Sequence, residues 1–170
     1  MKRSKSTDTI VVLLQLVETH KESMEGAAIR SLITSITMIL CSLETTKSVW
    51  SDENIVKAFT LLLKYCVHES GKIRHHAQDR LLTLFKVHHQ SQFPDTSQQV
   101  VFFLSNLNES FKADRPKNIS YFLAFIREVC QFLDSTVDEP LLKLLLEVRL
   151  DENIYCRYAN VRSITLTRIV

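Results

Sequence analysis

The sequence predicts an all-α fold class, an α-solenoid of about four antiparallel helix pairs without a sheet. Apolar residues recur with helical spacing along almost the whole chain of 170 residues. Only two glycines and three prolines are present, and strands and catalytic loops need these residues at their turns. The hydrophobic content of 45% and the charged content of 24% are ordinary for a globular protein that buries a core. These observations favour long helices joined by short connections.

The first half of the chain contains four predicted helices. They are expected at residues 8–20, 25–41, 52–68 and 72–86, the last preceded by Ser70 and Gly71. Ser23 is predicted to cap the second helix and Ser51 to start the third, because a serine hydroxyl accepts a hydrogen bond from a free backbone N–H. The third helix also carries acidic residues in its first turn, where the helix dipole favours them.

The second half begins after the longest polar connection, residues 87–99. Pro94 suits the first turn of a fifth helix over residues 95–107. Its "VVFFL" run has strand propensity, but the apolar positions keep helical spacing, so a helix is predicted. Three more helices are expected: 117–134, opened by Pro116 or Asn118; 139–150, opened by Asp138 and Pro140; and 153–169.

A comparison of the chain with itself indicates a repeat. Ile73 and Ala77 in the fourth helix resemble Tyr155 and Ala159 in the eighth, and 155 − 73 gives 82 residues, or about 41 for each helix pair. A period of about 40–47 residues is typical of HEAT or armadillo repeats. The second predicted helix starts about one further period before the fourth, so the helices are expected to stack in pairs.

The fourth predicted helix has a clear buried stripe. It comprises Ile73, Ala77, Leu81, Leu84 and Phe85. Ala77 is small where another helix must approach closely. Arg74 lies at the border of the stripe, and we expect it to bond carboxylates or carbonyls of its own or a neighbouring hairpin; ligand binding is the alternative. Gly71 is expected in a tight turn between helices, where its φ can be positive.

The histidines and cysteines do not predict a metal site. His75 and Asp79 have i, i+4 spacing, but structural zinc needs four convergent ligands and the four cysteines lie elsewhere in apolar runs, where buried free thiols are expected. His88 and His89 are expected in a solvated loop. We therefore predict no metal and no cofactor.

Catalytic motifs are also lacking. The sequence has no G-x-G-x-x-G, P-loop, H-E-x-x-H or nucleophile elbow, so no enzymatic activity is predicted. A net charge of +2 and a pI near 8.4 are too mild to indicate nucleic-acid binding. No stretch reads as a membrane span or signal peptide, so we expect a soluble, intracellular chain. Residues 1–7 are expected to be a flexible basic terminus, or alternatively part of a nuclear signal, and residues 8–170 one helical domain.

Residues 50–78, in which Trp50 is followed by "FTLLLKYCVHESGKIRHHAQ" (59–78), resemble the nucleolar HEAT-repeat family of ribosomal RNA-processing protein twelve. That family carries an apolar helix ending in Val-His, a short connection, and then Lys-Val/Ile-Arg-x-x-Ala-Gln. The matching residues here are Val67, His68, Lys72, Ile73, Arg74, Ala77 and Gln78. The chain departs from the pattern where the family tends to place prolines, at residues 69–71, and where small or basic residues follow the arginine, at residues 75–76. Because family members are much longer and this chain ends within a predicted helix, a segment of a longer solenoid is expected.

The resemblance implies a non-enzymatic scaffold of small-subunit ribosome precursors in the nucleus and nucleolus, linked to nuclear export. Its partners would be preribosomal proteins and also ribosomal RNA phosphates. The candidate contacts on the fourth helix are Lys72, His75, His76, Arg80 and Lys86. The alternative is a generic HEAT adaptor that binds a protein helix or linear motif in transport or signalling. A compact helical domain without repeats is disfavoured by the repeat spacing, and the direct partner and binding face stay open.

Overall fold

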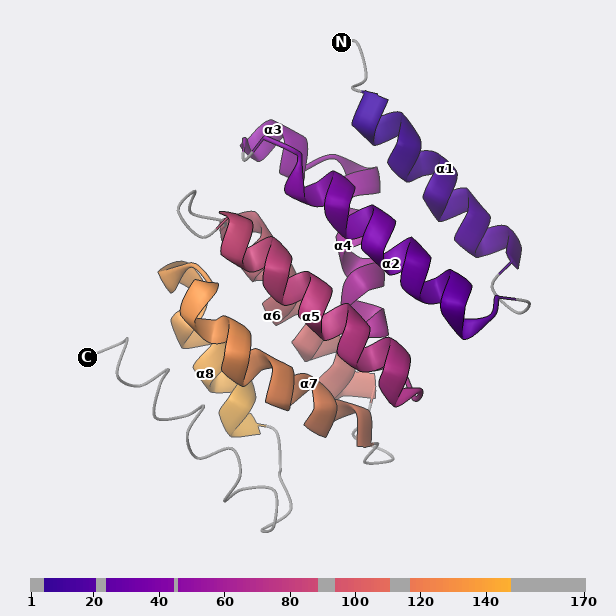
Figure 1. Cartoon of the computed structure of the whole chain (residues 1–170). Coiled ribbons are helices and arrows are strands. Elements are labelled where there is room, and N and C mark those ends of the chain that lie inside the picture. The colour runs from indigo at the N-terminus through magenta and orange to yellow at the C-terminus, as the bar shows by residue number, and fades with distance from the viewer. Residues whose placement is uncertain (1–4, 21–23, 45, 89–93, 111–116, 148–170) are drawn as a thin grey trace. The chain divides into compact units, whose positions relative to one another are not determined.

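A computed structural model of the chain describes residues 5–20, 24–44, 46–88, 94–110 and 117–147 (Figure 1). Within these ranges all regular secondary structure is helical, and the all-α prediction is confirmed. The chain forms two compact units, residues 1–91 and residues 92–170, which are described separately. The division falls inside the long polar connection at residues 87–99.

The first unit contains five helices. Their bounds are α1 Lys5–His20, α2 Gly26–Cys41, α3 Lys47–Trp50, α4 Glu53–Tyr65 and α5 Gly71–His88. Two hairpins, α1 with α2 and α4 with α5, pack so that α1 contacts α4 and α2 contacts α5. This stacking of first helix on first helix and second on second is the arrangement that the repeat period predicts.

The α2 and α5 helices run side by side in the same direction, as Figure 1 shows. Residues that come later in α2 contact residues that come later in α5. His76 Nε2 lies 2.9 Å from Thr34 Oγ1, and His88 Nε2 lies 3.2 Å from the Leu40 carbonyl oxygen further along. The prediction that the second and fourth helices lie on the same side is therefore confirmed.

The core of the first unit draws on all four long helices. Its largest fully buried side chains are Ile10, Ile33, Ile36, Leu40, Ile55, Phe59, Leu62, Leu63 and Leu81. Each such side chain contributes about 1.5–3 kcal/mol through removal of apolar surface from water. Because these residues recur every three or four positions, the helical periodicity of the sequence and the buried core coincide.

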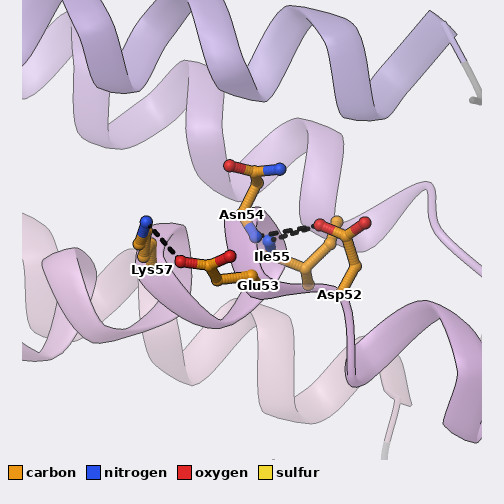
Figure 2. A network of polar contacts seen from close by, with 5 residues as sticks. All are labelled: Asp52, Glu53, Asn54, Ile55 and Lys57. Carbon is orange, nitrogen blue, oxygen red and sulfur yellow. Dashed lines mark hydrogen bonds and ion pairs between the residues drawn. The ribbon is translucent and has the colours of Figure 1, made fainter.

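Two predicted helix starts are wrong by one or two residues. The N-cap of α2 is Glu25, with extended φ and ψ of −69° and 153° and no side-chain hydrogen bond, rather than Ser23, which lies outside the described residues. The α4 helix is capped by Asp52 rather than Ser51. Its carboxylate accepts hydrogen bonds from the backbone nitrogens of Asn54 (2.9 Å) and Ile55 (3.4 Å), as Figure 2 shows. An ionised carboxylate complements the helix dipole better than a hydroxyl does.

An ion pair lies next to this cap. Lys57 Nζ is 2.7 Å from Glu53 Oε1, one turn apart on α4 (Figure 2). Both side chains are exposed, at 59% and 79%, so water screens their attraction. The hydrogen bond that Lys57 donates to Glu53 raises the pKa of Lys57, but the pair contributes little to stability.

The short helix α3 is not predicted by periodicity, because four residues are too few to show it. Val49 and Trp50 donate backbone hydrogen bonds to the Thr46 carbonyl and form this single turn. The buried Trp50 ring packs edge-on against Phe59, with ring centroids 6.3 Å apart. Its indole Nε1 donates to the Glu44 carbonyl at 3.2 Å. Tertiary packing of one aromatic ring thus fixes this turn.

The expectation of a solvated loop at His88 is wrong. The α5 helix continues two residues past its predicted end and terminates at His88, which is buried. Its ring lies edge-on to Trp50, with centroids 5.9 Å apart, beside the Leu40 carbonyl. Desolvation by burial lowers the pKa of His88, and the hydrogen bond to Leu40 opposes that shift. The Trp50 ring and the Leu40 carbonyl are the contacts that His88 makes at this buried position.

The second unit contains α6 Pro94–Ser110, α7 Lys117–Val129 and α8 Asp138–Glu147, with 3₁₀ turns at Cys130–Phe132 (η2) and Ser135–Val137 (η3). The "VVFFL" run lies in α6, as predicted, and Phe103 packs against Phe122 of α7 at 5.2 Å. The backbone nitrogen of Asp134 donates to Ser97 Oγ at 2.9 Å. The predicted eighth helix, with Tyr155 and Ala159, lies outside the described residues.

Candidate functional site

The α4–α5 connection is held by the arginine of the sequence signature. Arg74, on the first turn of α5, is only 8% exposed. Its Nη1 donates to the carbonyl of His68 at 2.9 Å and to that of Glu69 at 3.2 Å. Both acceptors belong to the connection that precedes α5, so this guanidinium ties the loop to the helix. The sequence predicts either carboxylates or carbonyls as acceptors for Arg74, and the structure shows hydrogen bonds to carbonyls of its own hairpin.

Two further residues of the signature bind the same connection. Gln78 Nε2 donates to the Cys66 carbonyl at 3.0 Å. The backbone nitrogen of Ser70 donates to His68 Nδ1 at 3.0 Å, so this nitrogen is unprotonated and accepts. The His68, Arg74 and Gln78 side chains therefore all contribute to the conformation of one short connection. The spacing of these residues in the sequence is explained by the hydrogen bonds that hold this connection.

Ala77 and Ile73 lie on the buried face of α5. Ala77 is fully buried in the helix that packs on both α2 and α4, where a larger side chain would collide. Gly71 is the first residue of α5, and its backbone is not left-handed, contrary to the expectation of a positive φ. A Cβ at Gly71 would lie 3.5 Å from Arg74 Nη2, an ordinary contact, so the turn does not require glycine.

The five candidate contact residues lie in two different environments. Lys72, His75 and Lys86 are exposed on the outer row of α5. His76 and Arg80 are half-buried; His76 bonds Thr34 of α2 through its ring nitrogen. Since His76 and Arg80 are one turn apart, both lie at the seam between α2 and α5. The structure therefore does not gather the five residues into a single cluster.

Reasoning from the sequence alone missed the neighbouring face of α2. The exposed residues within α2 are Ala27, Ala28, Ser31, Ser35 and Met38. None of them is charged, and only Met38 has a long side chain, which is 67% exposed. On a helical wheel of α2, the face opposite the buried stripe has no charged residue. Because this face is usually charged on a surface helix, the missing charge is the signal that could have identified this row.

The titratable and nucleophilic groups offer little chemistry in the part of the chain that the structure describes. No group of three or more His, Cys, Asp or Glu residues there is arranged to hold a metal ion. Cys66 and Cys130 are buried and Cys41 is half-buried. Burial raises the pKa of the Cys66 thiol far above its ordinary value and also raises that of Cys41, which disfavours the reactive thiolate. Cys156 lies outside the described residues.

A helix that crosses a bilayer must be long and predominantly apolar. None of the described helices combines the length and the apolar character needed to cross a bilayer.

The stacked hairpins, first helix on first helix and second on second, define a HEAT-repeat protein. The family model described as "RRP12-like, N-terminal HEAT repeats" matches residues 1–120, and the chain belongs to this family. The resemblance seen in residues 50–78 is thereby confirmed. Neither a search of curated proteins nor a search of solved structures found a match.

Proposed function

We propose that this chain is a non-enzymatic scaffold in small ribosomal subunit biogenesis. In this role it binds preribosomal components in the nucleus and nucleolus and supports ribosomal RNA processing and export. Membership in the RRP12-like family carries the proposal. The all-helical stack supports it, because each hairpin presents a long side surface for protein or nucleic-acid partners. The protein needs no cofactor for this function.

The α5 surface is the proposed contact. Within the sequence signature, Arg74 and Gln78 bond the α4–α5 connection, so they are not available to a partner. Three other cations of α5, Lys72, Arg80 and Lys86, share that helix with a single carboxylate, Asp79. A partner with negative charge complements this surface, whether that charge comes from carboxylates or from phosphates.

The test replaces these cations in the full chain. The variant carries Lys72→Glu, Lys86→Glu and Arg80→Gln; glutamine is used because Arg80 is half-buried. We expect the wild type to cosediment with preribosomal particles at low salt and the variant to lose this association. Phosphate contacts should also weaken as salt rises, since bound counterions are released on association.

A matched control changes exposed cations elsewhere by the same charge. It carries Lys64→Glu, Lys143→Glu and Arg127→Gln, all at exposed positions. Circular dichroism checks that both variants keep their helical content. If the α5 variant and the control cosediment as well as the wild type, the α5 surface is not the contact. If the wild type itself does not cosediment, the scaffold function is wrong.

A further inference from the structure

Arg80 carries a charge that the described residues do not neutralise. Its Nε is buried and has no hydrogen-bond partner in the described ranges, and no ion pair involving Arg80 is found there. Arg74, six residues earlier on α5, differs in that its Nη1 donates to two carbonyls of its own hairpin. A buried N–H of a charged group without an acceptor is costly. An acceptor supplied by a partner would remove this cost.

Arg80 lies at the seam between α2 and α5. It follows His76 by one helical turn, and His76 bonds Thr34 of α2 at 2.9 Å. Arg80 therefore lies where the exposed face of α2 meets that of α5. We call this surface the α2–α5 face. It comprises Ala27, Ser31, Ser35, Met38, Lys72, Arg80, Lys86 and Val87.

The shape and apolarity of this face favour a protein partner. On α2 the short side chains of Ala27, Ser31 and Ser35 leave room for the backbone of a second helix. At the carboxyl ends of the two helices, Met38 and Val87 are 67% and 56% exposed. Exposed methionine is frequent at surfaces that bind amphipathic helices, because its flexible thioether adapts to the partner.

The charges of the face favour an acidic partner. The α5 helix has three cations on this face, Lys72, Arg80 and Lys86, and a single carboxylate, Asp79. Lys72 and Lys86 are fourteen positions apart, which corresponds to about 21 Å along a helix at about 1.5 Å per residue. Single-stranded RNA is usually bound by closely spaced cations together with aromatic side chains. The exposed residues of α2 and α5 include no Phe, Tyr or Trp. A helix with carboxylates along one side fits these wide spacings better.

We propose that the α2–α5 face binds an acidic amphipathic helix of a partner protein, and that one carboxylate of this helix accepts hydrogen bonds from Arg80. The apolar side of the partner helix then covers Met38 and Val87, while Lys72 and Lys86 attract its flanking carboxylates. This inference rests on the proposed scaffold function for the identity of the assembly, a preribosomal particle, to which the partner helix belongs. The geometry of the face itself does not depend on that identity.

Photo-crosslinking tests the partner class. In the full chain, expressed in living cells, Ser35 is replaced by p-benzoylphenylalanine; exposed Gln15 on α1 serves as the control position. We expect Ser35 to crosslink to protein, in peptides with aspartate or glutamate at i, i+4 spacing, and Gln15 not to do so. Crosslinks from Ser35 to RNA, to peptides without such spacing, or to nothing overturn the proposal.

Substitution of Arg80 tests the role of its guanidinium. Arg80→Met should lower the crosslink yield at Ser35 about tenfold or more, as expected for loss of a charge-assisted hydrogen bond. The exposed Arg127→Met on α7 removes the same charge from the other unit and should leave the yield unchanged. An unchanged yield with Arg80→Met overturns the proposal.

Thermal unfolding separates binding from structure. Because the described residues provide no hydrogen bond to Arg80 Nε, Arg80→Met should keep the Tm of the first unit or raise it. A Tm lower by several degrees would make Arg80 structural and would overturn the proposal. Cosedimentation with preribosomal particles is scored separately. If the wild type does not cosediment, the scaffold function is wrong, whereas the crosslinks, collected from whole cells, still decide whether an acidic helix binds.

Discussion

The arginine that closes the α4–α5 connection is expected to stabilise the first unit strongly. Arg74→Met keeps most of the side-chain volume, so no large cavity forms, but it removes both hydrogen bonds to the carbonyls of His68 and Glu69. A hydrogen bond from a charged group contributes about 1.5–3 kcal/mol. The carbonyl of the exposed Glu69 can be rehydrated, and loss of the buried charge returns some desolvation energy.

These opposing effects reduce the expected loss to about that of one charged hydrogen bond. We therefore expect the free energy of unfolding of the first unit to fall by about 1.5–3 kcal/mol. For a unit of this size each kcal/mol corresponds to roughly 4–8 °C, so the Tm should fall by at least about 6 °C. The single tryptophan, Trp50, is buried in the first unit. Its fluorescence during urea unfolding reports on that unit alone.

Two variants control this measurement. Gln78→Leu removes one neutral hydrogen bond to the Cys66 carbonyl, and its expected cost is about 1 kcal/mol. The exposed Arg127→Met should stay within about 0.5 kcal/mol of wild type. If Arg74→Met unfolds at the same urea concentration as wild type, the connection does not depend on this guanidinium, and the structural role of the signature arginine is wrong.

Two more predictions concern the core of the first unit. Ala77→Leu should overpack α5 against its neighbours and destabilise the unit by about 1–3 kcal/mol; an unchanged urea midpoint would show that the site has room. Desolvation lowers the pKa of His88 below its unfolded value near 6.5, so the unfolded state binds more protons and stability should fall as the pH drops below about 6.5. His88→Gln should flatten this dependence in urea titrations from pH 7.5 to 5, and an equal slope in both proteins would contradict it.

Local sequence patterns were sufficient to predict the fold class. Helical periodicity depends only on which residues are apolar and how they are spaced, and the same spacing places Ile33, Ile36, Ile73 and Leu81 in the core. The scarcity of glycine and proline limited the number of turns, and the signature around Arg74 pointed to the family. Each of these properties is encoded within one or two helical turns of chain.

Helix ends depended on more than the local pattern. Ser51 and Asp52 are both good capping residues, and only the backbone path decides that Asp52 accepts from the next turn. The α3 turn exists because Trp50 packs on Phe59, a contact across nine residues. Such contacts leave no periodic trace in the sequence.

The sequence by itself determined the long helices of the described residues, the pairing of the first four predicted helices and the family. Only the tertiary structure decided which polar residues face inward. His88, predicted in a solvated loop, is buried because Trp50 and the Leu40 carbonyl meet it there. Arg74 and Arg80 are both arginines of α5, yet Arg74 donates to the carbonyls of His68 and Glu69, while Arg80 lies at the seam with α2. The partners of a side chain are set by packing between distant segments, which a local pattern does not contain.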